Sequence, residues 1–323
     1  MDPKKPDISV IVVCYNQEAT IARTLDSILA QRFDGSLEIL VSDDRSTDGT
    51  AEVARRYAAA HPDTVKVHVN ETNLGVQGNY FGAVRRAGAD LLADCAGDDW
   101  WCDPLKLQKE YDVMSARPDV TLVHTGFYNA FPDGSRRPFE PKSDARRPIV
   151  AGKEALLDLL CADDPPLIHL CSALYRRQPV TEALDEDPRT FLDPQWRCED
   201  LQIMAAECAA GDIAYIPDRT LCYSNDAGTI SSADTAAKTF DFYFDTTRLR
   251  MRLMRKYGVD RLPRCRRAMT RICNFLAAQA FTARSRHRLD ALSAWMRKEG
   301  VTKSLKTRIR LAAPIAYPLP RKK

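Results

Sequence analysis

No run of apolar residues in this 323-residue chain approaches the roughly 18 that a membrane-spanning helix needs. Residues 1–7 are polar, and the first apolar run, Ile8–Val13, is too short for the core of a signal peptide. The content of 45% hydrophobic and 28% charged residues is that of an ordinary globular protein. We therefore expect a cytoplasmic protein, with peripheral attachment to the inner face of a membrane as the further option.

Paired cysteines are also missing. The ten cysteines stand singly in apolar or mixed surroundings, with no CxxC motif and no Cys/His spacing of a zinc site. This pattern argues against a disulfide framework. It predicts reduced thiols that pack in the core.

Acidic residues are scarce at one end of the chain. Residues 246–323 hold 22 Lys and Arg against three acidic residues, a net charge of +19, whereas the other 245 residues carry −16. Such asymmetry indicates parts with different tasks. We expect a main domain over 1–234, with halves at about 1–127 and about 128–234, and a basic helical C-terminal extension over 235–323.

Apolar runs typical of buried strands alternate with helical patterns through the first half of the chain. The runs lie at 8–13, 37–42, 65–69, 89–96 and 120–127. This alternation predicts βαβ units, and thus an α/β fold with a mostly parallel sheet flanked by helices.

Two of the expected strands end in paired carboxylates. Asp43 and Asp44 follow 37–42, and Asp98 and Asp99 follow 89–96. Parallel strands deliver such groups to the carboxyl edge of the sheet, where open α/β sheets bind ligands. Because hard divalent cations prefer carboxylate and phosphate oxygens, this edge could hold a nucleotide and a metal ion together.

Structural roles remain open for these acids. Asp44 could cap the next helix, and the pair at Asp98 could face water at a strand end. Glu199 and Asp200 begin a predicted helix over 201–210, where the helix dipole favours a carboxylate and lowers its pKa. The functional alternative for Asp200 is a general base that removes a proton from an attacking hydroxyl.

Taken together, several segments resemble the family 2 glycosyltransferases, inverting enzymes with a GT-A fold that use nucleotide-diphosphate sugars. The resemblance covers about 8–230. The CAGDDWW segment is similar to a subgroup with a Gly-Asp-Asp-Tyr/Trp-Trp type of metal motif. The matching segments are ISVIVVCYNQEATIARTLDSILAQ (8–31), EILVSDDRSTDGT (38–50), NLGVQGNYFGAVRRAGADLL (73–92), CAGDDWWCDPLKLQKEYDVM (95–114) and CEDLQIMAAECAAGDIAYIPDRTLCYS (198–224).

The resemblance implies a nucleotide-sugar half at about 1–127 and an acceptor half at about 128–234, and it implies roles for the matching residues. Asp200 would be the catalytic base, and Asp98 would bind a divalent metal ion, Mn²⁺ or Mg²⁺. The nucleotide-sugar would contact Cys14, Tyr15, Asn16, Asp43, Asp44, Asn79, Asp98 and Asp99. On the acceptor side we place Trp100, Trp101, Glu199 and His169, with a hydrogen-bonded structural role still open for His169.

This chain also departs from the family pattern. Ala96 stands at the first acidic position of the metal motif, and Gly78 stands where many members carry an Arg near the phosphates. Ser224 and Asp226 replace an Arg and a His. Arg45 replaces a Gly, so we expect that turn to rely less freely on positive φ.

The implied activity is sugar transfer from a nucleotide-diphosphate sugar, with a UDP-sugar favoured, to a hydroxyl of a glycan or lipid-linked acceptor. A hexosyl- or N-acetylhexosaminyltransferase of cell-surface polysaccharide synthesis would fit. The alternative is a catalytically inactive nucleotide-sugar-binding module or partner subunit of the same fold. The retained Asp44, Asp98 and Asp200 favour the enzyme.

The basic tail over 246–323 suggests a further partner. In SLKTRIRLAAPIAYPLP, Leu305 and Ile309 share one side of a helix while Lys306 and Arg310 lie off it. This segment could lie on an anionic membrane surface, or its charges could face water or pair with the acidic domain. Nucleic acid is not expected as a partner, because the tail lacks an aromatic stacking platform and a helix-turn-helix pattern.

Overall fold

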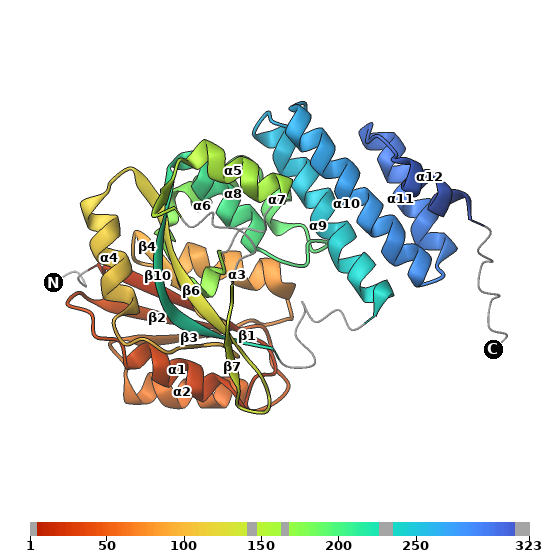
Figure 1. Cartoon of the computed structure of the whole chain (residues 1–323). Helices are drawn as coiled ribbons and strands as arrows, with labels where there is room; N and C mark the ends of the chain where they lie inside the picture. Colours follow the sequence, from red (N-terminus) through yellow and green to blue (C-terminus); the bar gives the residue numbers. More distant parts are fainter. Residues whose placement is uncertain (1–4, 141–146, 163–167, 226–234, 314–323) are drawn as a thin grey trace, which may run out of the picture. The chain divides into compact units, whose positions relative to one another are not determined.

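The structure is a computed structural model that describes residues 5–140, 147–162, 168–225 and 235–313 (Figure 1). The chain divides into two compact units. Unit 1 comprises Met1–Leu159, Asp164–Pro194 and Cys198–Asp226, and unit 2 comprises Leu160–Asp163, Gln195–Arg197 and Ala227–Lys323. Every candidate site residue named above belongs to unit 1.

Four strands of unit 1 form a parallel sheet. β1 (Ile8–Cys14) lies between β2 (Leu37–Asp43) and β4 (Leu91–Asp94), and β3 (Val65–Val69) pairs with the other side of β2. β1 and β2 are buried almost throughout, as strands covered by helices on both faces must be. The predicted α/β fold with a mostly parallel sheet is confirmed.

The sheet continues through six further strands. β9 is inserted antiparallel between β4 and β6, whereas β6 and β10 pair in parallel. The full order is β3-β2-β1-β4-β9-β6-β10-β5, with β7 beside β6 and β8 beside β10. The bounds are β5 (Trp100–Trp101), β6 (Val120–Ala130), β7 (Arg136–Pro138), β8 (Ile149–Val150), β9 (Ala173–Arg176) and β10 (Asp212–Ser224).

Helices cover both faces of this sheet. Figure 1 shows α1 and α2 on one face and α3, α6 and α8 on the other. In α1 the apolar residues Ile21, Leu25 and Ile28 recur at helical spacing and are fully buried, each contributing roughly 1.5–3 kcal/mol. The helices are α1 (Ile21–Leu29), α2 (Thr50–Ala60), α3 (Gly75–Arg86), α4 (Lys106–Ala116), α5 (Gly152–Cys161), α6 (Arg177–Glu186), α7 (Pro188–Leu192) and α8 (Asp200–Ala210).

Unit 2 is helical in its described part. It contains α9 (Ala236–Lys256), α10 (Pro263–Thr282), α11 (Arg286–Glu299) and α12 (Leu305–Ala312). Across the described residues, none of the helices has both the length and the apolar character needed to cross a bilayer. The buried core of this unit includes Phe240, Cys273, Leu276, Leu289, Leu292 and Met296.

The structure differs from the sequence-based expectations at several elements. The strand predicted over 89–96 ends at Asp94, and the two tryptophans then form β5, which pairs with β10. Within the helical extension expected over 235–323, the proline pattern predicts an interruption at Pro263, but this residue begins α10, where its missing N–H costs nothing. The Pro- and Arg-rich residues 132–148 read as a surface loop in the sequence, and 141–146 of them lie outside the described residues, as does Asp226.

Candidate active site

The carboxyl ends of β1, β2 and β4 meet at one edge of the sheet. Cys14 lies opposite Asp43 in the β1–β2 register. Just beyond the strands, the Asp44 N–H donates to the Cys14 carbonyl (2.9 Å), and the Gly97 N–H donates to the Val13 carbonyl (3.1 Å). These bonds bring together the three loops that carry most of the predicted nucleotide-binding residues.

Asp43 and Asn16 fix the turn after β2. The Asp43 carboxylate accepts from the backbone N–H of Ser46 (3.0 Å) and from its hydroxyl, and Asn16 Oδ1 accepts from the backbone N–H of Thr47 (2.8 Å). Arg45, inside this turn, has φ 63°. The expectation for Arg45 was therefore wrong: the turn keeps the left-handed conformation that suits glycine, at a cost of about 1–2 kcal/mol.

Asp44 holds the start of α3. Its Oδ1 accepts from Asn70 Nδ2 and from the backbone N–H of Leu74 (both 2.8 Å), and its Oδ2 accepts from the backbone N–H of Gly75 (2.9 Å). The residue is 4% exposed. Both carboxylate oxygens thus have partners within the chain, so this acid has a structural task whether or not it also contacts a nucleotide.

Asn79 joins α3 to β2. Its Oδ1 accepts from the Ser42 hydroxyl (2.7 Å) and from Asn70 Nδ2 (2.9 Å), and its Nδ2 donates to the Ser42 carbonyl (2.9 Å). Asn79 and Cys14 are both buried, whereas Tyr15 exposes 48% of its surface at the edge of the sheet. A direct contact of Asn79 with a nucleotide stays a prediction.

The loop that carries Asp98 and Asp99 is fastened from two sides. Arg23 of α1 donates to the Asp98 carbonyl (2.9 Å), and the Thr24 hydroxyl donates to the Asp99 carbonyl (2.6 Å). At the end of β10, the Ser224 N–H donates to Asp99 Oδ1 (2.8 Å), and the Ser224 hydroxyl donates to the Asp98 carbonyl. Ser224, which departs from the family pattern, thus holds this loop through two hydrogen bonds, which we call the Ser224 clamp.

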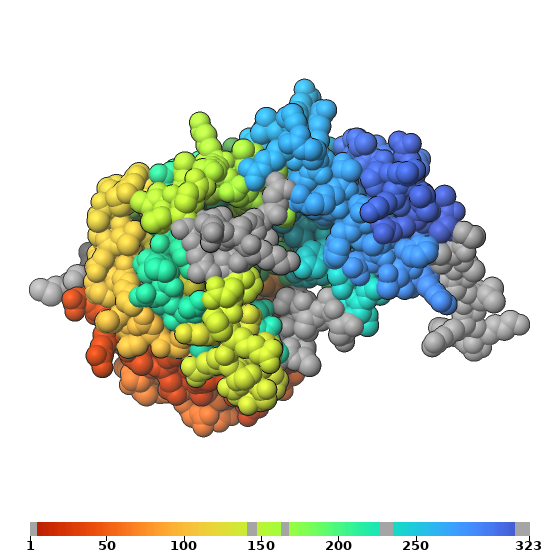
Figure 2. Space-filling view, in the orientation of Figure 1, coloured from red at the N-terminus to blue at the C-terminus, as the bar shows by residue number. Residues whose placement is uncertain are grey.

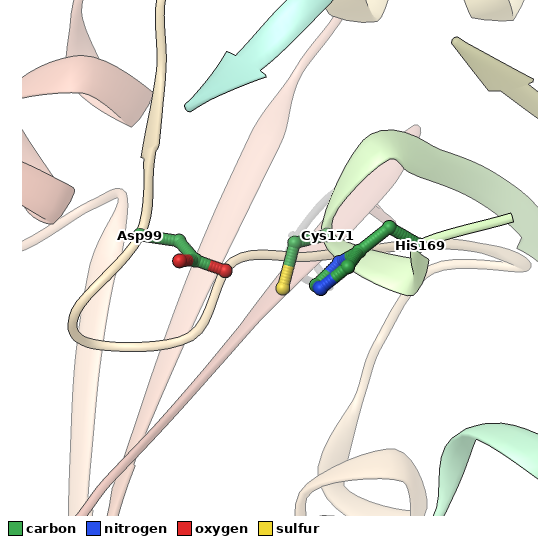
Figure 3. Close-up of side chains that lie close together, drawn as sticks. All are labelled: Asp99, His169 and Cys171. Atoms are coloured by element: carbon green, nitrogen blue, oxygen red, sulfur yellow. The ribbon is translucent and has the colours of Figure 1, made fainter. Parts of the chain in front are cut away.

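Asp99, His169 and Cys171 point toward one another (Figure 3), and their candidate ligand atoms lie within 4.8 Å of one another. Among the described residues, Asp99 Oδ2 and His169 Nδ1 have no hydrogen-bond partner. Burial lowers the pKa of His169 to about 4, so its ring is neutral at pH 7. Because nitrogen and sulfur suit Mg²⁺ and Mn²⁺ poorly, this trio differs from the hard-cation site predicted at Asp98.

The two tryptophans have different surroundings. Trp101 is buried, and its indole N–H donates to the Cys171 carbonyl (2.9 Å). Trp100 is half-buried and lines a cavity of about 360 Å³. Of the two, Trp100 is placed where a ligand could contact it.

Glu199 and Asp200 stand at the start of α8, as predicted. Both side chains keep partial access to solvent, but desolvation by the surrounding protein raises the pKa of Asp200 to about 6. Burial and the neighbouring charge of Asp200 raise the pKa of Glu199 well above its usual value. Desolvation therefore outweighs the helix dipole. A carboxylate with a pKa near 6 is ionised at neutral pH and is suited to accept a proton.

A buried acid that the sequence analysis did not single out lies close to this pair. Asp94, the last residue of β4, accepts hydrogen bonds from Tyr80 (2.7 Å) and Tyr175 (3.1 Å) through their hydroxyls. Burial raises its pKa to about 7, and the charge of Asp200 adds to the rise. The available signal was an acidic residue inside the apolar run LLADCAG, a position where a charge needs partners.

Comparison with known proteins assigns the chain to a family. The family described as Glycosyl transferase family 2 matches residues 9–183. The chain belongs to this family. In this chain, the matched region holds the strands and loops that bring Asp43, Asp44, Asp98 and Asp99 to one edge of the sheet.

Individual relatives of this family 2 chain are distant. Uncharacterized protein Rv1520 of Mycobacterium tuberculosis is 31% identical over 234 residues, which cover 72% of this chain and 63% of the relative. The chain therefore spans less than two thirds of the length of that relative. TuaG of Bacillus subtilis, a glycosyltransferase named for teichuronic acid biosynthesis, is 31% identical over 131 residues, 41% of this chain and 50% of TuaG.

Among solved structures, the family 2 chain resembles residues 1–349 of S. aureus TarS in complex with UDP-GlcNAc. The TM-score is 0.56 at 18% identity, and the match covers 94% of this chain and 90% of the TarS chain. At this identity the likeness concerns the fold alone, which supports the GT-A architecture.

Proposed function

We propose that this chain is an inverting glycosyltransferase that moves a sugar from a nucleotide-diphosphate sugar to an acceptor hydroxyl. The observation that carries the proposal is Asp200, a carboxylate at the start of α8 whose pKa is raised to about 6. The sequence resemblance implies the role of catalytic base for this residue. Its charge influences Asp94, which ends the strand leading to the Asp98–Asp99 loop. This electrostatic link supports a shared site.

In the proposed reaction, the Asp200 carboxylate accepts the proton of the acceptor hydroxyl. The hydroxyl oxygen forms a bond to the anomeric carbon of the donor sugar as the bond from that carbon to the nucleoside diphosphate breaks. A single displacement of this kind inverts the anomeric configuration. Tyr15, Asn16, Asp43, Asp44 and Asn79 would surround the nucleotide.

A divalent cation, Mn²⁺ or Mg²⁺, would be held by Asp98. The oxygen chemistry fits in part: Asp98 and Asp99 supply carboxylates, and Asp99 Oδ2 is a buried acceptor without a described partner, but Ala96 removes one acid. When bound, such an ion neutralises charge on the departing diphosphate. Arg23, Thr24 and Ser224 keep the loop in place by their bonds to its backbone and to Asp99.

A UDP-sugar is the favoured donor, and hexose or N-acetylhexosamine the favoured sugar. The name of TuaG, which refers to teichuronic acid biosynthesis, supports a role in cell-surface polysaccharide synthesis, with a glycan or lipid-linked acceptor. A cytoplasmic position fits such a donor.

Attachment to an anionic membrane through the basic segment 246–323 would bring the site to lipid-linked acceptors. In α12, Leu305 and Ile309 are 73% and 62% exposed, one turn apart. Lys306, Arg308 and Arg310 lie on the same short helix. Apolar side chains among cations suit an interfacial helix. Residues 314–323 of the segment lie outside the described part of the chain.

The test separates chemistry from binding. Asp200→Asn should lower transfer by about 10²–10⁴-fold while leaving nucleotide binding intact, because it removes the base but keeps the shape. Binding is read from thermal unfolding with UDP, GDP, dTDP or CMP, with and without Mn²⁺; ligand at 100 times its dissociation constant adds about 2.7 kcal/mol. Glu182→Gln, an exposed change on α6, is the matched control.

Transfer by the Asp200→Asn variant at the wild-type rate would refute the base assignment. Nucleotide binding by the wild type without any transfer to a broad panel of acceptors would favour the inactive-module alternative. Asp98→Ala should abolish the metal dependence of nucleotide binding, and unchanged metal dependence would remove Asp98 from the metal site.

A further inference from the structure

The cavity beside Trp100 has an unusual charge arrangement. Its volume is about 360 Å³, within the range of small-molecule sites. Arg23 lies 3.6 Å and Arg136 5.4 Å from the centre of the Trp100 ring, measured from their guanidinium carbons. The two cations therefore lie within about 9 Å of each other, and cation–π attraction holds both beside this ring.

Neither cation is neutralised by an ion pair. In the described part of the chain, no carboxylate forms a salt bridge with Arg23 or Arg136, and no acidic residue lines the cavity. Arg23 instead donates to the Asp98 carbonyl and to the Ser224 hydroxyl (3.4 Å). Arg23 also attracts the nearby Asp99 carboxyl, whereas Arg136 lies beside Trp100 without an ion pair to a described carboxylate, on a segment with a net charge of −16.

A third feature of the cavity also favours an anion. Thr20, the residue before α1, lines the cavity, so the N-terminal end of that helix, where its dipole is positive, borders it. The opposite wall comes from the β6–β7 hairpin, with Phe131 and the exposed Arg136. Figure 2 shows this yellow-green hairpin on the face of unit 1 turned toward the viewer.

We propose that this cavity binds an oxyanion carried by the acceptor, either a carboxylate or a phosphate group. Guanidinium groups recognise both anions through paired N–H donors. The cavity adjoins the Asp98 loop but takes its outer wall from 130–136, in the half of the domain expected to face the acceptor. Because this assignment to the acceptor rests on the proposed function, the experiment measures oxyanion binding separately from transfer.

The chain offers a matched pair of arginines for the test. Arg136 and Arg137 are adjacent and exposed on β7, where successive side chains point to opposite faces. Arg137 lies over the Phe131 ring at 4.9 Å and does not line the cavity. Arg136→Ala and Arg137→Ala thus remove the same charge from neighbouring exposed positions of one strand, but only the first removes it from the cavity lining.

Calorimetric titration of the full chain would use sodium glucuronate, inorganic phosphate and uncharged glucose as probes. We expect binding of at least one anion and no binding of glucose at the same concentration. Arg136→Ala should weaken the anion about 10-fold or more, Arg136→Lys less, and Arg137→Ala less than twofold. Glucuronate against phosphate distinguishes the two anion classes.

Nucleoside diphosphate binding by thermal unfolding provides the second measurement. Arg136→Ala should leave it unchanged, and an equal loss of UDP or GDP binding would instead assign the cavity to the donor diphosphate. Absence of anion binding by the wild type, or equal losses in the Arg136 and Arg137 variants, would overturn the proposal. Anion binding that depends on Arg136 in a protein without transfer activity would leave the cavity assignment standing and contradict only the proposed function.

Discussion

Removal of the Asp44 carboxylate should destabilise the protein strongly. Its two oxygens accept three hydrogen bonds, from Asn70 Nδ2 and from the N–H groups of Leu74 and Gly75, and the residue is 4% exposed. Asp44→Ala leaves three donors without their acceptor. Each hydrogen bond to a charged group contributes about 1.5–3 kcal/mol, and water can replace part of the bond at the exposed Leu74. We therefore expect the free energy of unfolding to fall by about 3–5 kcal/mol in total.

The measurement is urea unfolding of Asp44→Ala, Asp44→Asn and a control. Asp44→Asn keeps one oxygen for two of the donors, so it should lose about 1–3 kcal/mol. Asp63→Ala, an exposed aspartate near the start of β3, should change stability by less than about 0.5 kcal/mol. An Asp44→Ala loss below about 1 kcal/mol would refute this account of the carboxylate. If nucleotide binding alone disappeared, the acid would serve the ligand instead.

Three further predictions concern conformation and pH. Arg45→Gly should raise the free energy of unfolding by about 0.5–1 kcal/mol, because the strain energy of the left-handed Arg45 backbone exceeds the entropic cost of a more flexible unfolded chain. A loss of stability in urea unfolding would contradict this. Transfer should fall about tenfold per pH unit below about pH 6, because Asp200 must be ionised, and a pH-independent rate between 5 and 7 would exclude that role. In the folded protein the pKa of Asp94 is raised to about 7, so its neutral form contributes stability that is complete below about pH 4 and lost as pH rises through about 7. This loss should be on the order of a few kcal/mol, and thermal unfolding of Asp94→Asn should lack it. A variant with the same pH dependence as the wild type would contradict this role of Asp94.

The local pattern of the sequence was enough to predict strands of the parallel part of the sheet, which β1, β2, β3 and β4 form. β1, β2 and β3 lie within one residue of the runs at 8–13, 37–42 and 65–69. Each run is apolar because both of its faces are covered, and such burial leaves a signal in neighbouring residues. The edge at which the Asp pairs gather follows from the parallel topology.

The sequence did not reveal interactions between distant segments. The partners of Asp94 come from α3 and β9, and β5 exists only because Trp100 and Trp101 pair with β10. No window of local sequence contains such pairs. The same holds for Ser224, which stood out as a departure from the family pattern but whose bonds to the Asp98 loop required the folded chain.

The Ser224 clamp sets the order in which the site can form during synthesis. The bond from its N–H to Asp99 spans 125 residues, which a ribosome adds in roughly 6–25 s at 5–20 residues per second. Until β10 is available, the loop of Asp98 and Asp99 lacks one of its two attachments. The strands β1 to β4 can thus form early, whereas the loop of Asp98 and Asp99 is attached on both sides only when the last strand of the sheet has been made.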